Sequence, residues 1–190
     1  MPARVPALSG KRVVIFVDFT FEDLEVMYPK IRLEEEGAEV LTVGKHPAGT
    51  KYTGKHGYPL MSDMSVSDAP DPASVDALIL PGGFAPDYMR RDRTMLAFVS
   101  AMVQAKKPVA AICHGPWMLC SARHADGSPV LKGQRATGFC AIKDDMINAG
   151  ADFVDEPCVV STDNLITART PADLTPWCHA IIDAVVAYSS

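Results

Sequence analysis

The chain is short of three things: long hydrophobic runs, paired cysteines and an excess of basic residues. None of its apolar runs approaches the roughly 20 residues that a membrane-spanning helix needs, so we expect no membrane association. Residues 1–11 lack the apolar centre of a signal peptide, and we expect them to form a mobile lead-in to the first strand. The net charge of −5 offers no basic surface to phosphate backbones, which argues against nucleic-acid binding.

The five cysteines are scattered, odd in number and without a CxxC pair. This pattern excludes a disulfide framework and a metal site of the paired-cysteine type, and it favours free thiols in a reducing, cytoplasmic setting. We expect neither a metal nor another cofactor. At 190 residues, with 48% hydrophobic and 22% charged side chains, the chain has the size and composition of one soluble globular domain.

Apolar runs and helix-compatible segments alternate along the chain. We expect strands at 13–17, 38–43, 77–80, 108–112, 158–161 and 165–168. We expect helices from a capping box at 20–23 to about 36, from 92 to about 106, from the end of the fourth strand to about 122, at 138–149, and from Pro171 or Pro176 onwards. Residues 45–72 predict irregular structure with a short hairpin, and residues 162–164 predict a turn.

This alternation predicts an α/β fold, with a mostly parallel sheet and helices on both faces. In such sheets, ligands bind beyond the carboxyl ends of the strands. Three loops reach that edge, namely 18–23, 81–87 and 113–115. We therefore expect the functional site where these loops meet.

The most informative segment is Val109–Pro116, a short apolar run that ends in Cys-His-Gly and opens into a helix-compatible stretch. It has the form of a nucleophile elbow, a sharp strand-to-helix turn that holds one reactive side chain above a sheet. Cys113 is the candidate nucleophile, with the small residues Ala111 and Gly115 two positions to either side. The N-terminus of the new helix favours the thiolate, which is the reactive form. A buried core cysteine is the alternative for an isolated cysteine, but the elbow favours the nucleophile.

Residues on these loops supply partners for the sulfur. His114 is a candidate acid–base group, or its ring faces away and only its backbone N–H contributes. The Pro-Gly-Gly segment 81–83 is either a tight turn alone or, through one N–H beside that of His114, half of an oxyanion hole. Glu22 and Asp23 open the first helix. They complement its dipole, or one carboxylate contacts the sulfur and exchanges protons with it.

Six groups of segments, spread from the first strand to the C-terminal helix, are similar to one known family: 21–25 with 28–29, 53–58, 80–83 with 85–87, 111–116, 142–150 and 171–174. They read FEDLE with YP, TGKHGY, LPGG with APD, AICHGP, IKDDMINAG and PADL. The chain resembles the PfpI intracellular-protease (peptidase C56) branch of the ThiJ/PfpI superfamily, whose relatives include the parkinsonism-associated deglycase.

The resemblance implies a flavodoxin-like three-layer sandwich, also described as class-I glutamine amidotransferase-like. It implies that Cys113 is the nucleophile, that Glu22 hydrogen-bonds to its sulfur, and that the backbone N–H groups of Gly83 and His114 form the oxyanion hole. A further acid is implied at Asp87, where the family pattern has glutamate. In this branch that acid comes from a neighbouring subunit, and whether Asp87 acts within its own chain or in a neighbour stays open. The family forms dimers and larger rings, so we expect a homo-oligomer.

Family activities include peptidase, cofactor-independent glyoxalase and deglycase reactions. We expect reactive-carbonyl chemistry: the Cys113 thiolate adds to an aldehyde, Glu22 moves a proton between adjacent carbons, and a 2-hydroxy acid leaves after hydrolysis. The substrate is then a small aldehyde, or a peptide if the chain is instead a PfpI-type cysteine peptidase. A cysteine redox or stress sensor without turnover is a third hypothesis. A glutamine amidotransferase fits poorly, because residues 162–177 contain no histidine to complete a triad.

Overall fold

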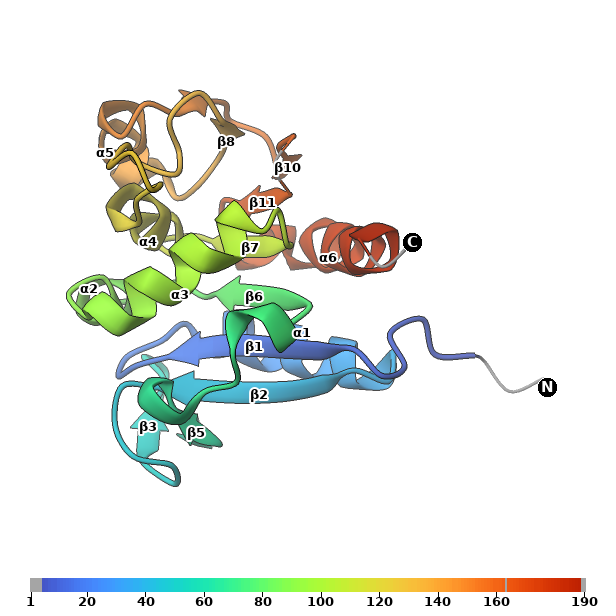
Figure 1. Ribbon diagram of the computed structural model, residues 1–190. Helices are drawn as coiled ribbons and strands as arrows, with labels where there is room; N and C mark the ends of the chain where they lie inside the picture. The colour runs from blue at the N-terminus through green and yellow to red at the C-terminus, as the bar shows by residue number, and fades with distance from the viewer. Residues whose placement is uncertain (1–4, 163, 189–190) are drawn as a thin grey trace.

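The computed structural model describes residues 5–162 and 164–188. Its centre is a seven-stranded sheet of order β10-β11-β7-β6-β1-β2-β5, and within the described residues every neighbouring pair is parallel except β10–β11 (Figure 1). The strands are β1 (Arg12–Val17), β2 (Glu39–Gly44), β5 (Met64–Ser65), β6 (Ala77–Leu80), β7 (Val109–Ile112), β10 (Cys158–Val160) and β11 (Leu165–Ala168). The predicted mostly parallel sheet is confirmed.

Helices cover both faces of this sheet. On one face α1 (Asp23–Glu35) packs against α6 (Leu174–Tyr188). On the other, α3 (Arg93–Gln104) lies over β6 and β7 and contacts α4 (Pro116–Ser121), which in turn contacts α2 (Ala85–Met89) and α5 (Lys143–Asn148) (Figure 1). Together these layers form the expected α/β sandwich. The continuous apolar runs follow from it, because every residue of β6 and β7 is buried in the middle of the sheet.

Smaller elements fill the connections. The hairpin expected within 45–72 is present as β3 (Lys51–Thr53) and β4 (Pro59–Met61), followed by two 3₁₀ turns, η1 (Val66–Asp68) and η2 (Pro72–Ser74). A separate parallel pair joins β8 (Arg135–Ala136) to β9 (Asp152–Phe153). Two further 3₁₀ turns precede helices: η3 (Cys140–Ile142) before α5, and η4 (Pro171–Asp173) before α6.

Several predicted boundaries are wrong. The helix expected from residue 138 begins as η3 at Cys140, and the last helix begins at Leu174, between the two prolines considered. Helix α2 begins within the predicted loop 81–87. The turn expected at 162–164 includes Asp163, which lies outside the described residues.

The start of α1 also differs from the predicted capping box. Glu22 is the N-cap, and no side chain of the described residues caps it. The Thr20 hydroxyl donates to the carbonyl oxygen of Phe19 (2.7 Å), because Thr20 has a positive φ of 57° that turns it away from the helix. The end of the helix is as expected, since Gly37 follows it with a φ of 89°. Residue Leu8, in the segment expected to be a mobile lead-in, is fully buried.

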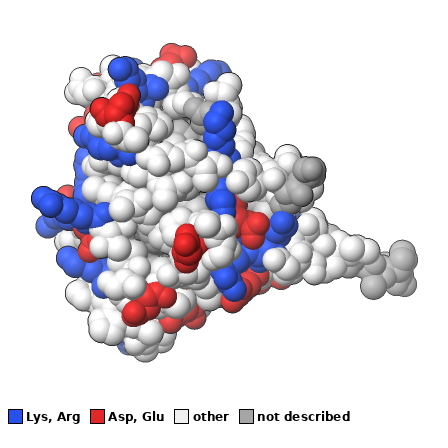
Figure 2. Space-filling view, viewed as in Figure 1, with Lys and Arg blue, Asp and Glu red and all other residues white. Residues whose placement is uncertain are grey.

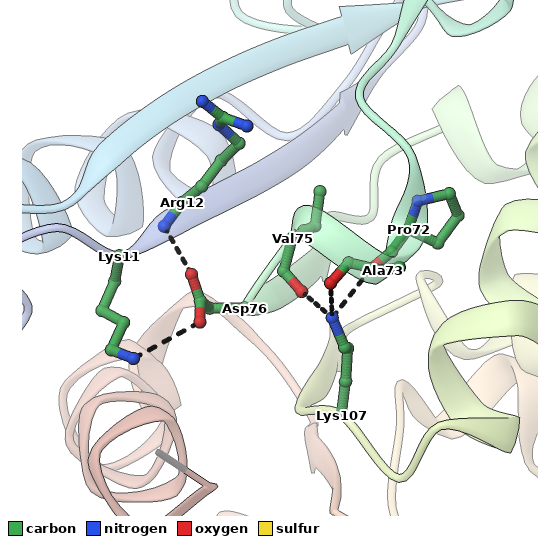
Figure 3. Close-up of polar contacts among 7 residues, drawn as sticks. All are labelled: Lys11, Arg12, Pro72, Ala73, Val75, Asp76 and Lys107. Atoms are coloured by element: carbon green, nitrogen blue, oxygen red, sulfur yellow. Dashed lines mark hydrogen bonds and ion pairs between the residues drawn. The ribbon is translucent and has the colours of Figure 1, made fainter.

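A buried lysine holds the connection between β5 and β6. The Lys107 ammonium donates to the carbonyl oxygens of Pro72 (2.9 Å), Ala73 (2.6 Å) and Val75 (2.7 Å), as Figure 3 shows. Burial lowers the pKa of Lys107. Three carbonyl acceptors match the three N–H donors of an ammonium group, so the lysine satisfies a turn that would otherwise leave buried acceptors unpaired.

Asp76, which follows Val75 in the chain, connects this turn to the start of β1. Its carboxylate accepts from the backbone N–H of Arg12 (2.8 Å) and lies 3.5 Å from the Lys11 ammonium (Figure 3).

Charges of both signs are scattered over the face seen in Figure 2. Within the described ranges, no helix combines the length and apolar character needed to cross a membrane.

Candidate active site

β7 ends in a sharp turn that holds Cys113 at the carboxyl edge of the sheet. Cys113 has a positive φ of 59°, a backbone conformation that is costly for a residue with a Cβ. Its N–H donates to the carbonyl oxygen of Ala168 on β11 (3.0 Å), and its carbonyl oxygen accepts from the N–H of Phe139 (2.9 Å). The structure therefore contains the elbow-like turn predicted from the sequence, with the strained residue held from two sides.

Two glycines let this turn approach its neighbours. A Cβ on Gly115 would lie 2.1 Å from the Leu80 carbonyl oxygen. A Cβ on Gly82 would lie 2.8 Å from both the Cβ of Cys113 and the backbone nitrogen of His114. Any side chain at either position would push the β6 and β7 loops apart, so both glycines are required by close approach.

Two backbone N–H groups point at the Cys113 sulfur. They belong to Gly83 and His114, the pair predicted to form an oxyanion hole, and their hydrogen bonds lower the pKa of Cys113. Burial has a larger effect, and with the charge of Glu25 it raises the pKa of Cys113 to about 12. The contribution of Glu25 applies only where Glu25 is ionised, whereas that of burial is always present. Burial thus favours the thiol, against the thiolate that the helix N-terminus predicts, because removal of the sulfur from water outweighs the nearby N–H dipoles.

The carboxyl group beside this sulfur belongs to Glu25. Its side chain is completely buried, and one oxygen, Oε2, accepts from the N–H of Gly82 (2.7 Å). The Cys113 side chain lies within interaction range of the carboxyl group. The other oxygen, Oε1, is buried and makes no well-formed hydrogen bond within the described residues.

Burial, with a smaller contribution from the charge of Glu22, raises the pKa of Glu25 to about 8. Most Glu25 side chains are therefore carboxylic acids at neutral pH. Protonation also explains Oε1, since a buried carboxylate oxygen without a donor is costly, whereas a carboxylic acid carries its own hydrogen there. The structure thus pairs a thiol with a neutral acid that can give and take a proton.

Glu22, which we expected to contact the sulfur, makes a different interaction. It forms an ion pair with the Lys55 ammonium, and its Oε1 lies 3.8 Å from Nε2 of His56. Glu22 lines the same pocket as Cys113, but Glu25 is the carboxyl group that acts on the sulfur. The reason is helical geometry, because Glu25 follows Glu22 by almost one turn and so lies beneath the Gly82 loop.

Asp23 anchors the turn that carries Lys55. Its carboxylate accepts from the N–H groups of His56 and Tyr58, both at 2.9 Å. Glu22, Asp23 and His56 offer possible ligand atoms within 4.8 Å of one another, the one such group found in the described residues. Protein donors already occupy both Asp23 oxygens, and Lys55 neutralises Glu22. This arrangement serves as an anchor for the turn and does not require a metal ion.

The His114 ring faces the sulfur. Nδ1 lies 3.2 Å from Sγ of Cys113, and the ring packs edge-on against Trp117 and at a tilt against Phe139, with centroids 5.1 and 4.9 Å away. Burial, followed by the charge of Lys55, lowers the pKa of His114. The imidazole is therefore neutral at neutral pH, and in the suitable tautomer Nδ1 can accept the thiol proton.

Asp87 lies apart from these groups. It is in the first turn of α2, about half exposed, and it pairs with Arg91 one turn later. Within the described part of one chain, no contact joins Asp87 to His114. A role for Asp87 at this site stays a prediction that concerns a second copy of the chain.

All three predicted loops contribute to one pocket of about 180 Å³ around the sulfur. Its walls are aromatic on one side, and a single ammonium group, that of Lys55, reaches it among the described side chains. The lining residues are Glu22, Lys55, Gly83, Phe84, Cys113, His114, Trp117, Phe139, Thr170 and Pro171. The pocket is large enough for a small metabolite but too small for an extended peptide.

The family model described as DJ-1/PfpI family matches residues 11–184, which include every one of these groups. The chain belongs to the DJ-1/PfpI family. A DJ-1/PfpI protein named as a deglycase in Pyrococcus abyssi is 44% identical over 171 residues, which cover 90% of this chain and 97% of the relative. Protein/nucleic acid deglycase 2 of Escherichia coli is 40% identical over 165 residues, which cover 87% of this chain and 92% of that protein.

A solved structure supports the same placement in the DJ-1/PfpI family. It is a two-domain protein of Anabaena variabilis with DJ-1/ThiJ/PfpI-like and ferritin-like domains. The match has a TM-score of 0.84 and 41% identity, and it covers 91% of this chain and 47% of that one. The longer protein therefore has a second part that this chain does not match.

Sequence reasoning missed Glu25, Lys55 and the aromatic wall. A signal for Glu25 was present, because Val26, Pro29 and Leu33 mark the buried stripe of α1 and Glu25 lies at its edge. A charged residue on a core-facing stripe indicates a special environment. No comparable signal identifies Phe139, which reaches the pocket through a tertiary contact with the elbow.

Proposed function

We propose that this DJ-1/PfpI protein is a cysteine-dependent enzyme for reactive carbonyls, which converts 2-oxoaldehydes and their adducts into 2-hydroxy acids. The observation that carries the proposal is the buried Glu25 carboxyl group against the Cys113 thiol, which itself lines a pocket of about 180 Å³. A group that holds a proton at neutral pH beside the nucleophile suits proton transfer within a small bound substrate. The deglycase names of two relatives agree with this proposal.

The first step is addition of sulfur to the aldehyde carbon. His114 Nδ1 accepts the thiol proton as the S–C bond forms, and the resulting oxyanion takes the N–H groups of Gly83 and His114 that faced the sulfur. The Glu25 carboxylic acid gives its proton to that oxygen, which forms a hemithioacetal and leaves Glu25 ionised. This step needs the thiolate only transiently, so a resting thiol is compatible with it.

The second step moves hydrogen between adjacent carbons. The ionised Glu25 removes the proton from the former aldehyde carbon, and the protonated His114 gives its proton to the neighbouring carbonyl oxygen, which forms an enediol. Glu25 then returns the proton to the second carbon while His114 takes the proton of the first hydroxyl group, which leaves a thioester and a new hydroxyl group. Water hydrolyses the thioester to a 2-hydroxy acid and frees Cys113. For methylglyoxal, the sum is addition of one water to give lactate, with no external oxidant or reductant.

Peptide hydrolysis is the second candidate. It fits the site less well, because the pocket is small and His114 has no carboxylate partner within the described residues of one chain. Glu25 also lacks a role in that reaction. A second chain that brings Asp87 to His114 would make peptide hydrolysis a better fit to the site.

Exposed apolar side chains on α1, Leu24 and Ile31, support our proposal that the protein forms a homo-oligomer.

Lactate formation from methylglyoxal tests the proposal directly. We expect purified protein to produce lactate, Cys113→Ala to abolish it, and Glu25→Gln to reduce kcat by about 100-fold or more. The matched variant Glu22→Gln changes the carboxyl group that lines the pocket but does not contact the sulfur, and it should cost less than about tenfold. Loss with Glu22→Gln but not with Glu25→Gln would return the proton-transfer role to Glu22.

The same preparation separates the alternatives. Cleavage of an unstructured peptide that depends on Cys113, without lactate formation, would establish the peptidase. Neither product, together with selective oxygen uptake by Cys113 under mild peroxide, would support the redox sensor.

A further inference from the structure

A second cavity adjoins the Cys113 pocket. Its volume is about 460 Å³, and Phe139 and Thr170 line both cavities, so the two share a wall. We call it the outer cavity. Its other side is formed by residues of α5, β9 and the end of β11, including Lys143, Phe153 and Arg169. In Figure 1, α5 lies next to α4, the helix that follows the elbow.

The sizes of the two cavities suggest a division of a substrate between them. About 180 Å³ around the sulfur suits a three-carbon aldehyde unit, but not that unit together with the thiol or amine compound that carries it as an adduct. A carrier group must extend out of the inner pocket. The outer cavity has the volume for an amino acid or a short peptide, and its shared wall places it next to the inner pocket.

The charges of the outer cavity favour an acidic carrier. The Arg169 guanidinium is already committed, since it donates to Asp155 (2.8 Å) and to both oxygens of the buried Asp173 (3.0 and 3.2 Å). Lys143 is different. Its ammonium lies 5.8 Å from the centre of the Phe153 ring, and no carboxylate in the described part of the chain pairs with it.

Asp155 is the acidic group that competes with this interpretation. Its side chain is 80% exposed and ion-paired with Arg169, so water and the guanidinium screen its charge. The Lys143 ammonium is held over an apolar ring at the cavity wall, which leaves its N–H donors available to a ligand oxygen. A carboxylate with an apolar body matches this combination of an ammonium group and two phenyl rings.

We propose that the outer cavity binds the carrier part of an aldehyde adduct and that Lys143 binds its carboxylate. The protein would then prefer adducts of amino acids and short peptides with a free carboxylate over neutral or cationic adducts. The role of the inner pocket in this proposal rests on the proposed function. Recognition of the carboxylate in the outer cavity does not.

Three thioethers test the charge preference: N-acetyl-S-(2-oxopropyl)cysteine, its neutral amide, and its cationic amide with 2-(trimethylammonio)ethylamine. Each holds the same three-carbon ketone, and the compounds differ only in the group at the carboxyl end. Binding to the full-length protein at pH 7 is measured by calorimetry. We expect the carboxylate to bind about fivefold more tightly than the amide, as for a partly exposed ion pair.

Variants locate the preference. Lys143→Met should bring the ratio of carboxylate to amide affinity close to one, and Lys143→Arg should restore most of it. Lys132→Met, which removes another exposed lysine of the same region, should keep the ratio. Equal affinities in the unmodified protein, tighter binding of the cationic compound, or a ratio unchanged by Lys143→Met would overturn the proposal.

Methylglyoxal turnover by the unmodified protein keeps the two proposals apart. A carboxylate preference that depends on Lys143, without lactate formation, would leave the outer cavity as assigned and reject the proposed function. Lactate formation without any carboxylate preference would support the proposed function and reject the assignment of the outer cavity.

Discussion

Replacing Glu25 with glutamine should make the protein more stable above neutral pH. Burial raises the pKa of Glu25 from 4.5 to about 8, so the folded state holds this proton more tightly than the unfolded chain does. Below pH 4.5 both states are protonated, and the group has no effect. Between pH 4.5 and about 8 the unfolded chain releases the proton while the folded protein keeps it, so folding becomes progressively less favourable. Above that range the penalty is constant.

The size of this penalty follows from the difference between the two pKa values. At about 1.4 kcal/mol for each pH unit, it amounts to roughly 5 kcal/mol at its full extent. Glutamine keeps the shape of the side chain, and its amide oxygen can still accept from the N–H of Gly82. The variant lacks the titration, so its gain over the unmodified protein should grow from about 1 kcal/mol at pH 5 to about 4–5 kcal/mol at pH 8.5.

Urea unfolding followed by tryptophan fluorescence at pH 5 and pH 8.5 measures this difference. Glu34→Gln is the matched control, because Glu34 lies on the same helix, is 43% exposed and pairs only with Lys30 among the described residues. It should change the free energy of unfolding by less than about 1 kcal/mol at either pH. If Glu25→Gln follows the unmodified protein and the control at both pH values, Glu25 is ionised in the folded state and our reasoning about the site fails.

Three other changes test separate parts of the structure. Gly115→Ala places a Cβ 2.1 Å from a carbonyl oxygen. We expect it to lower the free energy of unfolding, measured by thermal unfolding, by about 3 kcal/mol and to abolish the reactivity of Cys113. A fully reactive variant would refute the close-approach argument. Lys107→Met leaves three carbonyl oxygens without their donor, that of Val75 buried, and should cost about 2 kcal/mol in urea unfolding, so a cost below about 0.5 kcal/mol would contradict it. Lys55→Met removes a charge that lowers the pKa of Cys113, so iodoacetamide alkylation should shift to higher pH, whereas Lys51→Met should leave the profile unchanged.

The middle of the central sheet could be predicted from the sequence because β6 and β7 are apolar over their whole length and β1 is apolar after Arg12. The runs that became β1, β6 and β7 allow few alternatives, since a segment buried on both faces shows no alternation. Asp92 likewise marked the start of α3, where its side chain accepts from the N–H groups of Thr94 and Met95. Such a helix start can be predicted because the residues that cap it are close together in the sequence.

The site was less predictable, because it depends on which residue a helix turns toward the sulfur. From the sequence, Glu22 and Glu25 are both acids near the start of α1, and only the position of the Gly82 loop distinguishes them. The direction of the pKa shift of Cys113 was also not visible in the sequence, since the degree of burial of a side chain follows from packing between distant segments. Phe139 could not be predicted for the same reason, as it reaches the site from a loop 26 residues beyond Cys113 along the chain.

One backbone hydrogen bond, from the N–H of Phe139 to the carbonyl oxygen of Cys113, couples the two cavities mechanically. Phe139 lines both cavities, so a ligand that displaced its ring would act on the residue whose N–H holds the Cys113 carbonyl oxygen. We therefore expect the orientation of the nucleophile to respond to a ligand in the outer cavity. Exchange of the Phe139 amide hydrogen with solvent would report that strain at a distance from the reacting atoms.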